Sequence, residues 1–223
     1  MFIKAVNLTK IYRKGSSKIV AVNRVNLEVK NGEFIVIVGP SGSGKTTLLN
    51  LIGLNDYPTS GKIFIDGVDA TMLSKRERRK IRLLRIGFIF QTFNLFPTLN
   101  ALENVELPLA LAGKSQMEQR ERAIKLLKSV GLADRIFHRP RELSMGEMQR
   151  VAIARAMANN PEVLIADEPT GELDSETSRE VVGLLSEINR KQKATVIVAT
   201  HDERIVRVAS SVYRIVDGKL SLE

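Results

Sequence analysis

Apolar and polar residues alternate over two early stretches of the chain, residues 2–8 and 20–29. A period of two predicts strands that bury one face. Three later runs, at 34–38, 163–166 and 195–199, are apolar at nearly every position, as is typical of strands buried on both faces. Because helical stretches separate these buried strands, the pattern predicts a parallel sheet covered by helices.

The pattern takes on a helical period between Gln91 and Asn160. Ser115 and Glu118 match a capping box, in which two side chains bond free backbone N–H groups at the start of a helix. The helix that follows has one apolar face, made by Ala123, Leu126, Leu127 and Val130. The middle third therefore indicates a helical subdomain inserted between the strands.

A glycine-rich loop follows the first buried strand, precedes a helical stretch and matches G-x-x-x-x-G-K-[ST]. Its residues are Gly39, Pro40, Ser41, Gly42, Ser43, Gly44, Lys45 and Thr46. Glycines let backbone N–H groups surround phosphate oxygens, and the helix N-terminus adds the positive end of its dipole. Lys45 can place a charge on the β- and γ-phosphates, and the hydroxyl of Thr46 can ligate Mg²⁺. The alternative is a glycine-rich turn with a chance lysine, and the strand–loop–helix context argues against it.

Two acids, Asp167 and Glu168, end the second buried strand. An acid at this edge of a sheet can hold Mg²⁺, and its neighbour can orient or deprotonate a water molecule. Adjacent carboxylates repel each other unless a cation lies between them. His201 follows the third buried strand, where it could reach a γ-phosphate, although a lone histidine is more often structural.

Residues 143–156 read LSMGEMQRVAIARA. With the glycine-rich loop and the two acids, this stretch resembles the signature helix of ABC ATPases, usually LSGGQ followed by a stretch like QQRVAIARA. The resemblance covers the whole chain and implies an α/β fold: a P-loop NTPase core with a mainly parallel sheet, an antiparallel β subdomain and an inserted helical subdomain. Residues 1–223 would form a single domain, with 1–90 and 160–223 as the nucleotide-binding core with its β subdomain and 91–159 as the helical subdomain.

The resemblance also implies a role for each matching residue. ATP would be bound by an aromatic residue that stacks on adenine and by the whole phosphate loop: Tyr12, Gly39, Pro40, Ser41, Gly42, Ser43, Gly44, Lys45, Thr46 and Thr47. Mg²⁺ would be held by Thr46, Gln91 and Asp167. The catalytic group would comprise Glu168 as base, His201 as switch and Gln91 as sensor of a membrane partner.

A homodimer on ATP binding is the next implication, because the signature lies far along the chain from the phosphate loop. Ser144, Gly146 and Asp174 would contact the ATP held by the opposite subunit, and a two-fold interface makes both sites at once. The chain departs from the usual pattern at three positions. Met145 replaces a signature glycine, Glu147 replaces the signature glutamine, and Glu172 replaces a small residue before Leu173 and Asp174.

Residues 90–109 resemble the subgroup that serves lipoprotein-release and macrolide-export systems, and similar stretches occur around antimicrobial-peptide exporters. The resemblance implies that ATP-driven dimer closure powers a separate membrane permease. No apolar run approaches the ~20 residues needed to cross a bilayer, and Met1 to Lys4 lack a signal-peptide pattern. We therefore expect a cytoplasmic protein, peripheral on the inner face of the cell membrane. The transported substrate stays open.

The formal net charge of +9 favours anionic partners, and a solvated basic surface explains it equally well. Among ABC ATPases, chromosome-maintenance types carry long coiled-coil arms and translation types carry two cassettes, neither of which this sequence contains, so no nucleic acid is expected. A regulatory subunit of a membrane machine remains an alternative. A basic cluster opens after a capping box at Ser74 and is predicted to face the membrane or solvent: Lys75, Arg76, Arg78, Arg79, Lys80, Arg82 and Arg85.

Overall fold

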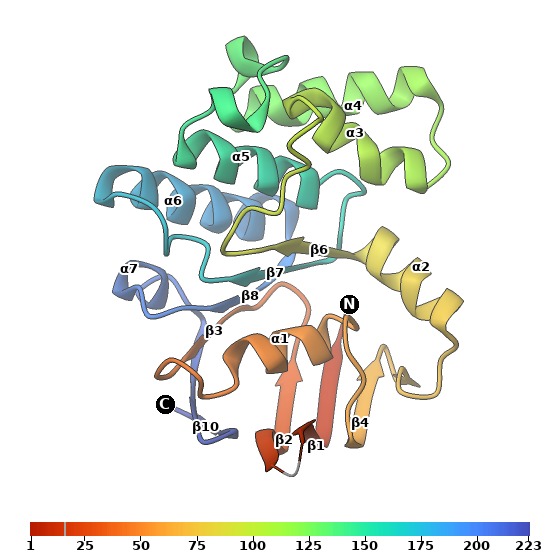
Figure 1. The fold of residues 1–223 in the computed structure, drawn as a ribbon, viewed down its shortest axis with the longest axis vertical. Helices are drawn as coiled ribbons and strands as arrows, with labels where there is room; N and C mark the ends of the chain where they lie inside the picture. Colours follow the sequence, from red (N-terminus) through yellow and green to blue (C-terminus); the bar gives the residue numbers. More distant parts are fainter. Residues whose placement is uncertain (16) are drawn as a thin grey trace.

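The computed structural model describes residues 1–15 and 17–223, and it contains two sheets flanked by helices (Figure 1). The first sheet has four strands in the order β2-β1-β4-β5, and each neighbouring pair is antiparallel. Its strands are β1 (Ile3–Lys14), β2 (Ser17–Val29), β4 (Ser60–Ile65) and β5 (Val68–Asp69). Alternation along β1 and β2 buries one face of this sheet, as the period of two predicts.

The second sheet has six strands in the order β10-β9-β3-β8-β7-β6. All of its neighbouring pairs are parallel except β10 with β9. Its strands are β3 (Phe34–Val38), β6 (Ile86–Ile89), β7 (Val163–Asp167), β8 (Thr195–Ala199), β9 (Ser211–Val216) and β10 (Lys219–Leu222). Every residue of β7 and β8 is buried. The mixed α/β fold with a mainly parallel sheet and an antiparallel sheet is confirmed.

Helix α1 (Lys45–Ile52) directly follows β3 and lies between the two sheets (Figure 1). Its buried residues share one apolar core with both sheets, and this core includes Leu8, Ile37 and Ile165. A second core covers the other face of the parallel sheet. There α6 (Ser175–Gln192) packs beside the short helix α7 (Glu203–Val206).

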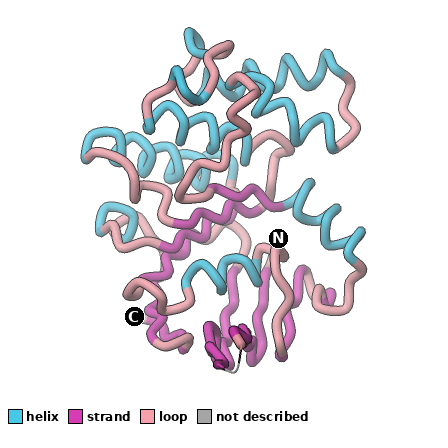
Figure 2. Tube along the Cα trace, viewed as in Figure 1, coloured by secondary structure: helices cyan, strands magenta, loops and turns pink. Residues whose placement is uncertain are grey.

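The chain between β6 and β7 is largely helical and forms one end of the molecule (Figure 2). It comprises α3 (Ala101–Leu111), α4 (Gln116–Ser129), two single-turn 3-10 helices and α5 (Met145–Ala156). Capping boxes start all three α-helices, at Asn100, Ser115 and Ser144. Their apolar faces meet the core that Phe34 and Val196 of the sheet also line, so the inserted helices are packed onto the strands below them.

Helix α2 (Lys75–Arg85) carries the basic cluster, and the prediction that the whole cluster faces the membrane or solvent is wrong for Arg78, whereas Arg82 and Arg85 are partly buried. Arg78 is only 1% exposed, donates to the carbonyl oxygens of Ala70 and Leu54, and stacks on the ring of Tyr57 at 3.9 Å. Arg82 donates to the Leu54 carbonyl at 2.9 Å. Arg85 pairs with Asp66 and Glu162. A run of like charges does not reveal which side chains turn inward to bond backbone carbonyls.

Within residues 1–15 and 17–223, the structure has no helix that combines the length and the apolar character needed to span a bilayer.

Candidate functional site

The phosphate loop lies between β3 and α1, where its glycines allow close approaches that a side chain would block. A Cβ at Gly39 would overlap the carbonyl oxygen of Ile215, and a Cβ at Gly44 would overlap that of Ala21. Gly44 has φ 107° and ends the loop as the N-cap of α1. The backbone of the loop is therefore wedged between β2 and β9 at the N-terminus of a helix.

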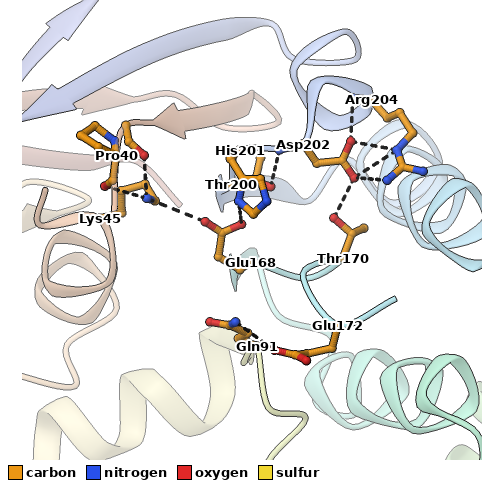
Figure 3. A network of polar contacts seen from close by, with 11 residues as sticks. Pro40, Lys45, Gln91, Glu168, Thr170, Glu172, Thr200, His201, Asp202 and Arg204 are labelled. Carbon is orange, nitrogen blue, oxygen red and sulfur yellow. Dashed lines mark hydrogen bonds and ion pairs between the residues drawn. The ribbon is translucent and has the colours of Figure 1, made fainter. Parts of the chain in front are cut away.

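Lys45 folds back over this loop. Its Nζ donates to the carbonyl oxygens of Gly39 and Pro40 at 2.8 and 3.2 Å and lies 3.8 Å from Oε1 of Glu168 (Figure 3). The ammonium group thus lies at the centre of the loop, where phosphate oxygens can replace these carbonyl oxygens as its hydrogen-bond acceptors. The hydroxyl of Ser43, also in the loop, is buried and has no hydrogen-bond partner in the described structure, so a polar ligand here would satisfy it.

Asp167 ends β7 at the same edge of the sheet. Its Oδ1 is buried without a hydrogen-bond partner among the described residues. Burial raises the pKa of Asp167, the hydroxyl of Thr46 opposes that shift by hydrogen bonding, and the charge of Glu168 adds to it. An acceptor held beside a threonine hydroxyl fits Mg²⁺, which keeps several waters and takes few protein ligands. Among residues 1–15 and 17–223, the structure has no cluster of three His, Cys, Asp or Glu suited to a metal.

Glu168 adopts the left-handed backbone region, with φ 45°. Its N–H donates to the carbonyl of Ala199 at 2.8 Å and its own carbonyl accepts from Gly171 at 3.1 Å, which fixes this uncommon conformation. The carboxylate therefore turns toward Lys45 on one side and toward Nδ1 of His201, 3.0 Å from Oε2, on the other (Figure 3). Three predicted site residues from separate parts of the chain meet here.

The loop after β8 is held by a second set of contacts. The N–H of Asp202 donates to the hydroxyl of Thr200 at 3.0 Å, and Asp202 pairs with Arg204 at 2.8 Å. Asp202 also accepts a hydrogen bond of 2.8 Å from Thr170, which lies in the segment that follows Glu168 (Figure 3). The loop that carries His201 is thereby tied to the loop that carries Glu168, while the side chain of His201 stays 77% exposed.

Gln91 follows β6 and approaches the same segment from the opposite side. Its Nε2 donates to Oε1 of Glu172 at 3.2 Å (Figure 3). The sequence marked Glu172 only as a departure from a family pattern, and 81 residues separate the partners, so no local signal predicts their contact. In this structure the side chain of Gln91 is held toward the 170s loop.

Arg155 is a positioning residue that sequence reasoning missed. It lies in the last turn of α5 and donates to the carbonyl oxygens of Phe93, at 2.8 Å, and Asn94. Phe93 and Asn94 both have positive φ, 59° and 48°, so the loop after Gln91 makes a tight turn. The guanidinium fastens this turn to the end of the signature helix.

Tyr12 lies at the end of β1, next to the first turn of α1. Its hydroxyl donates to Asp56 at 2.9 Å, and burial together with this bond raises its pKa, while a contact with Thr47 opposes the shift. The Lys10 ammonium lies 5.0 Å from the ring centroid, and the residue is 40% exposed. An exposed aromatic ring beside the phosphate-loop helix can accept a flat base.

Ser144, Gly146 and Asp174 lie at two helix N-termini away from this centre. The Ser144 hydroxyl caps α5 by accepting from the N–H of Glu147 at 3.2 Å, and Asp174 caps α6. Gly146 is buried, and a Cβ at this position would overlap the methyl group of Thr177, whose hydroxyl donates to Asp174 at 2.6 Å. In the described residues, no hydrogen bond or ion pair joins these three residues to Lys45 or Glu168.

Known proteins share both the sequence and the fold of this chain. The profile of the ABC transporter family matches residues 22–171. The chain is 48% identical to the uncharacterized ABC transporter ATP-binding protein MJ0796 of Methanocaldococcus jannaschii, across 99% of this chain and 96% of that protein. It is 44% identical to the macrolide export ATP-binding/permease protein MacB of Syntrophobacter fumaroxidans, across 99% of this chain and 31% of that protein. A dimeric, post-hydrolysis structure of MJ0796 with ADP and Pi superposes with a TM-score of 0.93 at 46% identity, covering 99% and 97% of the two chains.

Proposed function

Since this chain belongs to the ABC transporter family of ATP-binding domains, and is an ATPase of that type, we propose that ATP closes two copies of it head to tail and that this closure drives a membrane permease. One observation carries the proposal. Lys45, Asp167 and Glu168 are gathered at one edge of the parallel sheet, whereas Ser144 lies exposed at the start of another helix. A second copy can supply the missing half of the site.

In this mechanism the phosphate loop and Lys45 hold the β- and γ-phosphates. Thr46, Asp167 and Gln91 would hold Mg²⁺, which would neutralise phosphate charge. Glu168 orients a water and takes its proton as the water oxygen bonds to the γ-phosphorus and the bond to the bridging oxygen breaks. The side chain of His201, 3.0 Å from Glu168, is exposed enough to contact the γ-phosphate. Loss of that phosphate removes the contacts that hold the two copies together.

The N-terminus of α5 is suited to the opposite γ-phosphate. Ser144 presents its hydroxyl together with the positive end of the helix dipole, and both favour an anion. The capping bonds to Glu147 fix the serine before any partner arrives. The dimeric structure of MJ0796 with ADP and Pi supports this arrangement for the present chain.

A groove of about 320 Å³ beside Gln91 offers a docking place for the permease. It is lined mainly by apolar side chains from β6, the loop after it and α3, including Phe88, Phe90, Phe96, Leu107 and Leu111. Phe96 and Leu111 are well exposed, and exposed apolar residues that cluster at a groove are typical of an interaction site. A permease segment in this groove would contact the turn that follows Gln91 and would hold the protein against the inner face of the cell membrane.

The likeness to MacB supports a permease of the macrolide-export type, and residues 90–109 also resemble the lipoprotein-release subgroup. MacB is named as an ATP-binding protein and a permease in one, and this chain corresponds to about a third of it. The present chain would therefore work with a permease encoded on a separate polypeptide or in a longer protein of which it is part.

The permease can be sought by affinity purification from detergent-solubilised membranes of the native cells, followed by mass spectrometry. We expect an integral membrane protein to co-purify with the parent chain and to be lost with Phe96→Asp. The matched control is Phe137→Asp, since Phe137 is also an exposed phenylalanine but lies outside the groove. Equal recovery of the membrane protein with both variants would remove the groove as the docking place.

A further inference from the structure

The exposed face of α2 carries four cations that neither the ATP site nor the docking groove uses. Lys75, Arg76, Arg79 and Lys80 are all exposed. In residues 1–15 and 17–223, none of the ion pairs involves any of them. The one acid of the helix, Glu77, is bonded to Ser74 in the capping box.

This arrangement works against the stability of the helix. Lys75 with Arg79 and Arg76 with Lys80 are like-charge pairs four residues apart, which repel each other on one face. Lys75 and Arg76 also stand in the first turn, where the positive end of the helix dipole disfavours cations. Glu77 offsets part of this cost at the dipole. Because no acid among residues 1–15 and 17–223 forms an ion pair with any of the four cations, their charges are available to an anionic partner outside the chain.

The opposite face of α2 is fastened to the body of the protein. Arg78 is buried on Tyr57 and on backbone carbonyls, Arg82 bonds the Leu54 carbonyl, and Arg85 pairs with two acids. The helix cannot roll to hide its outer face without breaking these bonds. The backbone positions of the four exposed cations are therefore fixed relative to one another, which lowers part of the ordering cost of binding a ligand.

The surroundings of these cations contain apolar groups as well. They line a shallow hollow of about 540 Å³ together with Leu83. Leu83 also lines the proposed docking groove, so the hollow below the cations and the groove adjoin at this residue. Just before the helix, Met72 is 81% exposed, more than any other large hydrophobic residue in the described chain. Cations that flank an exposed apolar side chain suit the interface between lipid headgroups and acyl chains.

We propose that the exposed face of α2 binds the phosphate groups of anionic lipids at the membrane surface beside the permease. The four cations bind the headgroups, and Met72 enters the interface next to them. Each cation close to an acidic bilayer raises the partition coefficient roughly five-fold, and salt weakens the effect. This binding needs neither ATP nor a permease, so it stands or fails separately from the proposed function.

The test is flotation of the purified chain with vesicles, without nucleotide. The variant changes Lys75, Arg76, Arg79 and Lys80 to Gln. The control changes Lys30, Lys128, Lys193 and Lys219 to Gln, which removes the same charge from exposed positions elsewhere. With vesicles that contain phosphatidylglycerol, we expect the α2 variant to lose roughly a hundred-fold or more in partition and the control to lose far less. Vesicles of phosphatidylcholine should bind neither variant nor the parent.

The melting temperature of the α2 variant and its co-purification with the permease distinguish lost lipid binding from other causes. The melting temperature of the α2 variant should equal or exceed that of the parent, because the like-charge repulsion is gone, which separates lost binding from lost folding. Equal losses in variant and control would mean that net charge alone attracts the chain and would overturn the proposal. Unchanged vesicle binding with a loss of permease co-purification would overturn it too, because the face would then bind acidic groups of the permease.

Discussion

The two halves of the proposed ATP site differ in how complete they are in a single chain. At the phosphate loop, buried polar atoms such as Ser43 Oγ and Asp167 Oδ1 lack partners in the described structure, and the Lys45 ammonium bonds its own loop. At the signature, the Ser144 hydroxyl and the Asp174 carboxylate already cap helices. The first half has unsatisfied groups that a ligand would satisfy, whereas the Ser144 hydroxyl and the Asp174 carboxylate of the second half are satisfied and exposed.

This difference indicates an order of events. Unsatisfied buried groups favour ligand binding because a polar ligand removes their desolvation penalty. Nucleotide should therefore bind first at the phosphate loop of one chain. The signature half adds little to that step, since it lies elsewhere on the surface, and it should matter chiefly when two chains close. Variants in the two halves should consequently affect different measurements.

The largest effect is expected on ATP turnover, from a variant that leaves both halves of the site able to assemble but removes the base. Glu168→Gln should lower ATP turnover by about 10²–10⁴-fold, because the base that takes the water proton is lost. ATP binding should persist, and the closed dimer should accumulate. Light scattering with ATP and Mg²⁺ measures the mass. A monomer with parental turnover would contradict both the base role and the dimer.

Lys45→Ala removes a central charge from the first half only. We expect ATP affinity to fall by about 10–100-fold through loss of charged hydrogen bonds to the phosphates, with an unchanged fold. Titration of the isolated chain with a fluorescent ATP analogue measures the affinity, and circular dichroism checks the fold. Parental affinity would sink the assignment of this loop.

Gly146→Ala disturbs the second half. The new Cβ would overlap the methyl group of Thr177, and such overpacking costs about 1–3 kcal/mol of stability. The melting temperature should fall, and ATP-driven dimerisation should weaken more than ATP binding by one chain. Adding Thr177→Ser removes that methyl group but keeps the hydroxyl that bonds Asp174, so it should restore much of the loss. No rescue by Thr177→Ser would show that the glycine is needed for another reason.

Glu172→Ala tests the contact between Gln91 and the loop near Asp174. Freed from its carboxylate partner, Gln91 should reach Mg²⁺ more readily, and the Mg²⁺ concentration for half-maximal turnover should fall about two- to three-fold, as expected for one exposed hydrogen bond. Glu172→Gln is the control, since its oxygen can still accept from Gln91. If Glu172→Gln lowers the Mg²⁺ requirement as much as Glu172→Ala does, the charge of Glu172 controls Gln91 and the hydrogen bond does not.

The smallest effect is expected at Met145, which is 55% exposed and loses little packing when truncated. Met145→Gly should strengthen dimerisation slightly in the Glu168→Gln background by allowing closer approach. Met145→Ala separates the effect of side-chain bulk from that of backbone entropy, because glycine loses more conformational freedom on folding than alanine. Weaker dimerisation in both variants, with lower melting temperatures, would assign Met145 a packing role instead.

Much of the architecture follows from local patterns. The apolar runs at 34–38, 163–166 and 195–199 match buried strands, and the glycine-rich loop lies between strand and helix as predicted. Contacts between distant residues could not be read from the sequence. Neither the burial of Arg78 nor the bond from Gln91 to Glu172 has a local signal, because each depends on which elements the fold brings together.

Helix α5 has one end at Ser144 and the other at Arg155, which holds the turn beside the docking groove. A stiff helix joins these two places, so a shift at one end is a shift at the other. Thermodynamic linkage then requires a reciprocal effect. If permease binding raises the affinity between two ATP-bound copies by some factor, dimer closure raises the affinity for the permease by the same factor. Linkage alone gives the cycle no direction, because it acts equally both ways. Hydrolysis of ATP is the irreversible step, so ATP sets the direction in which the transporter cycles.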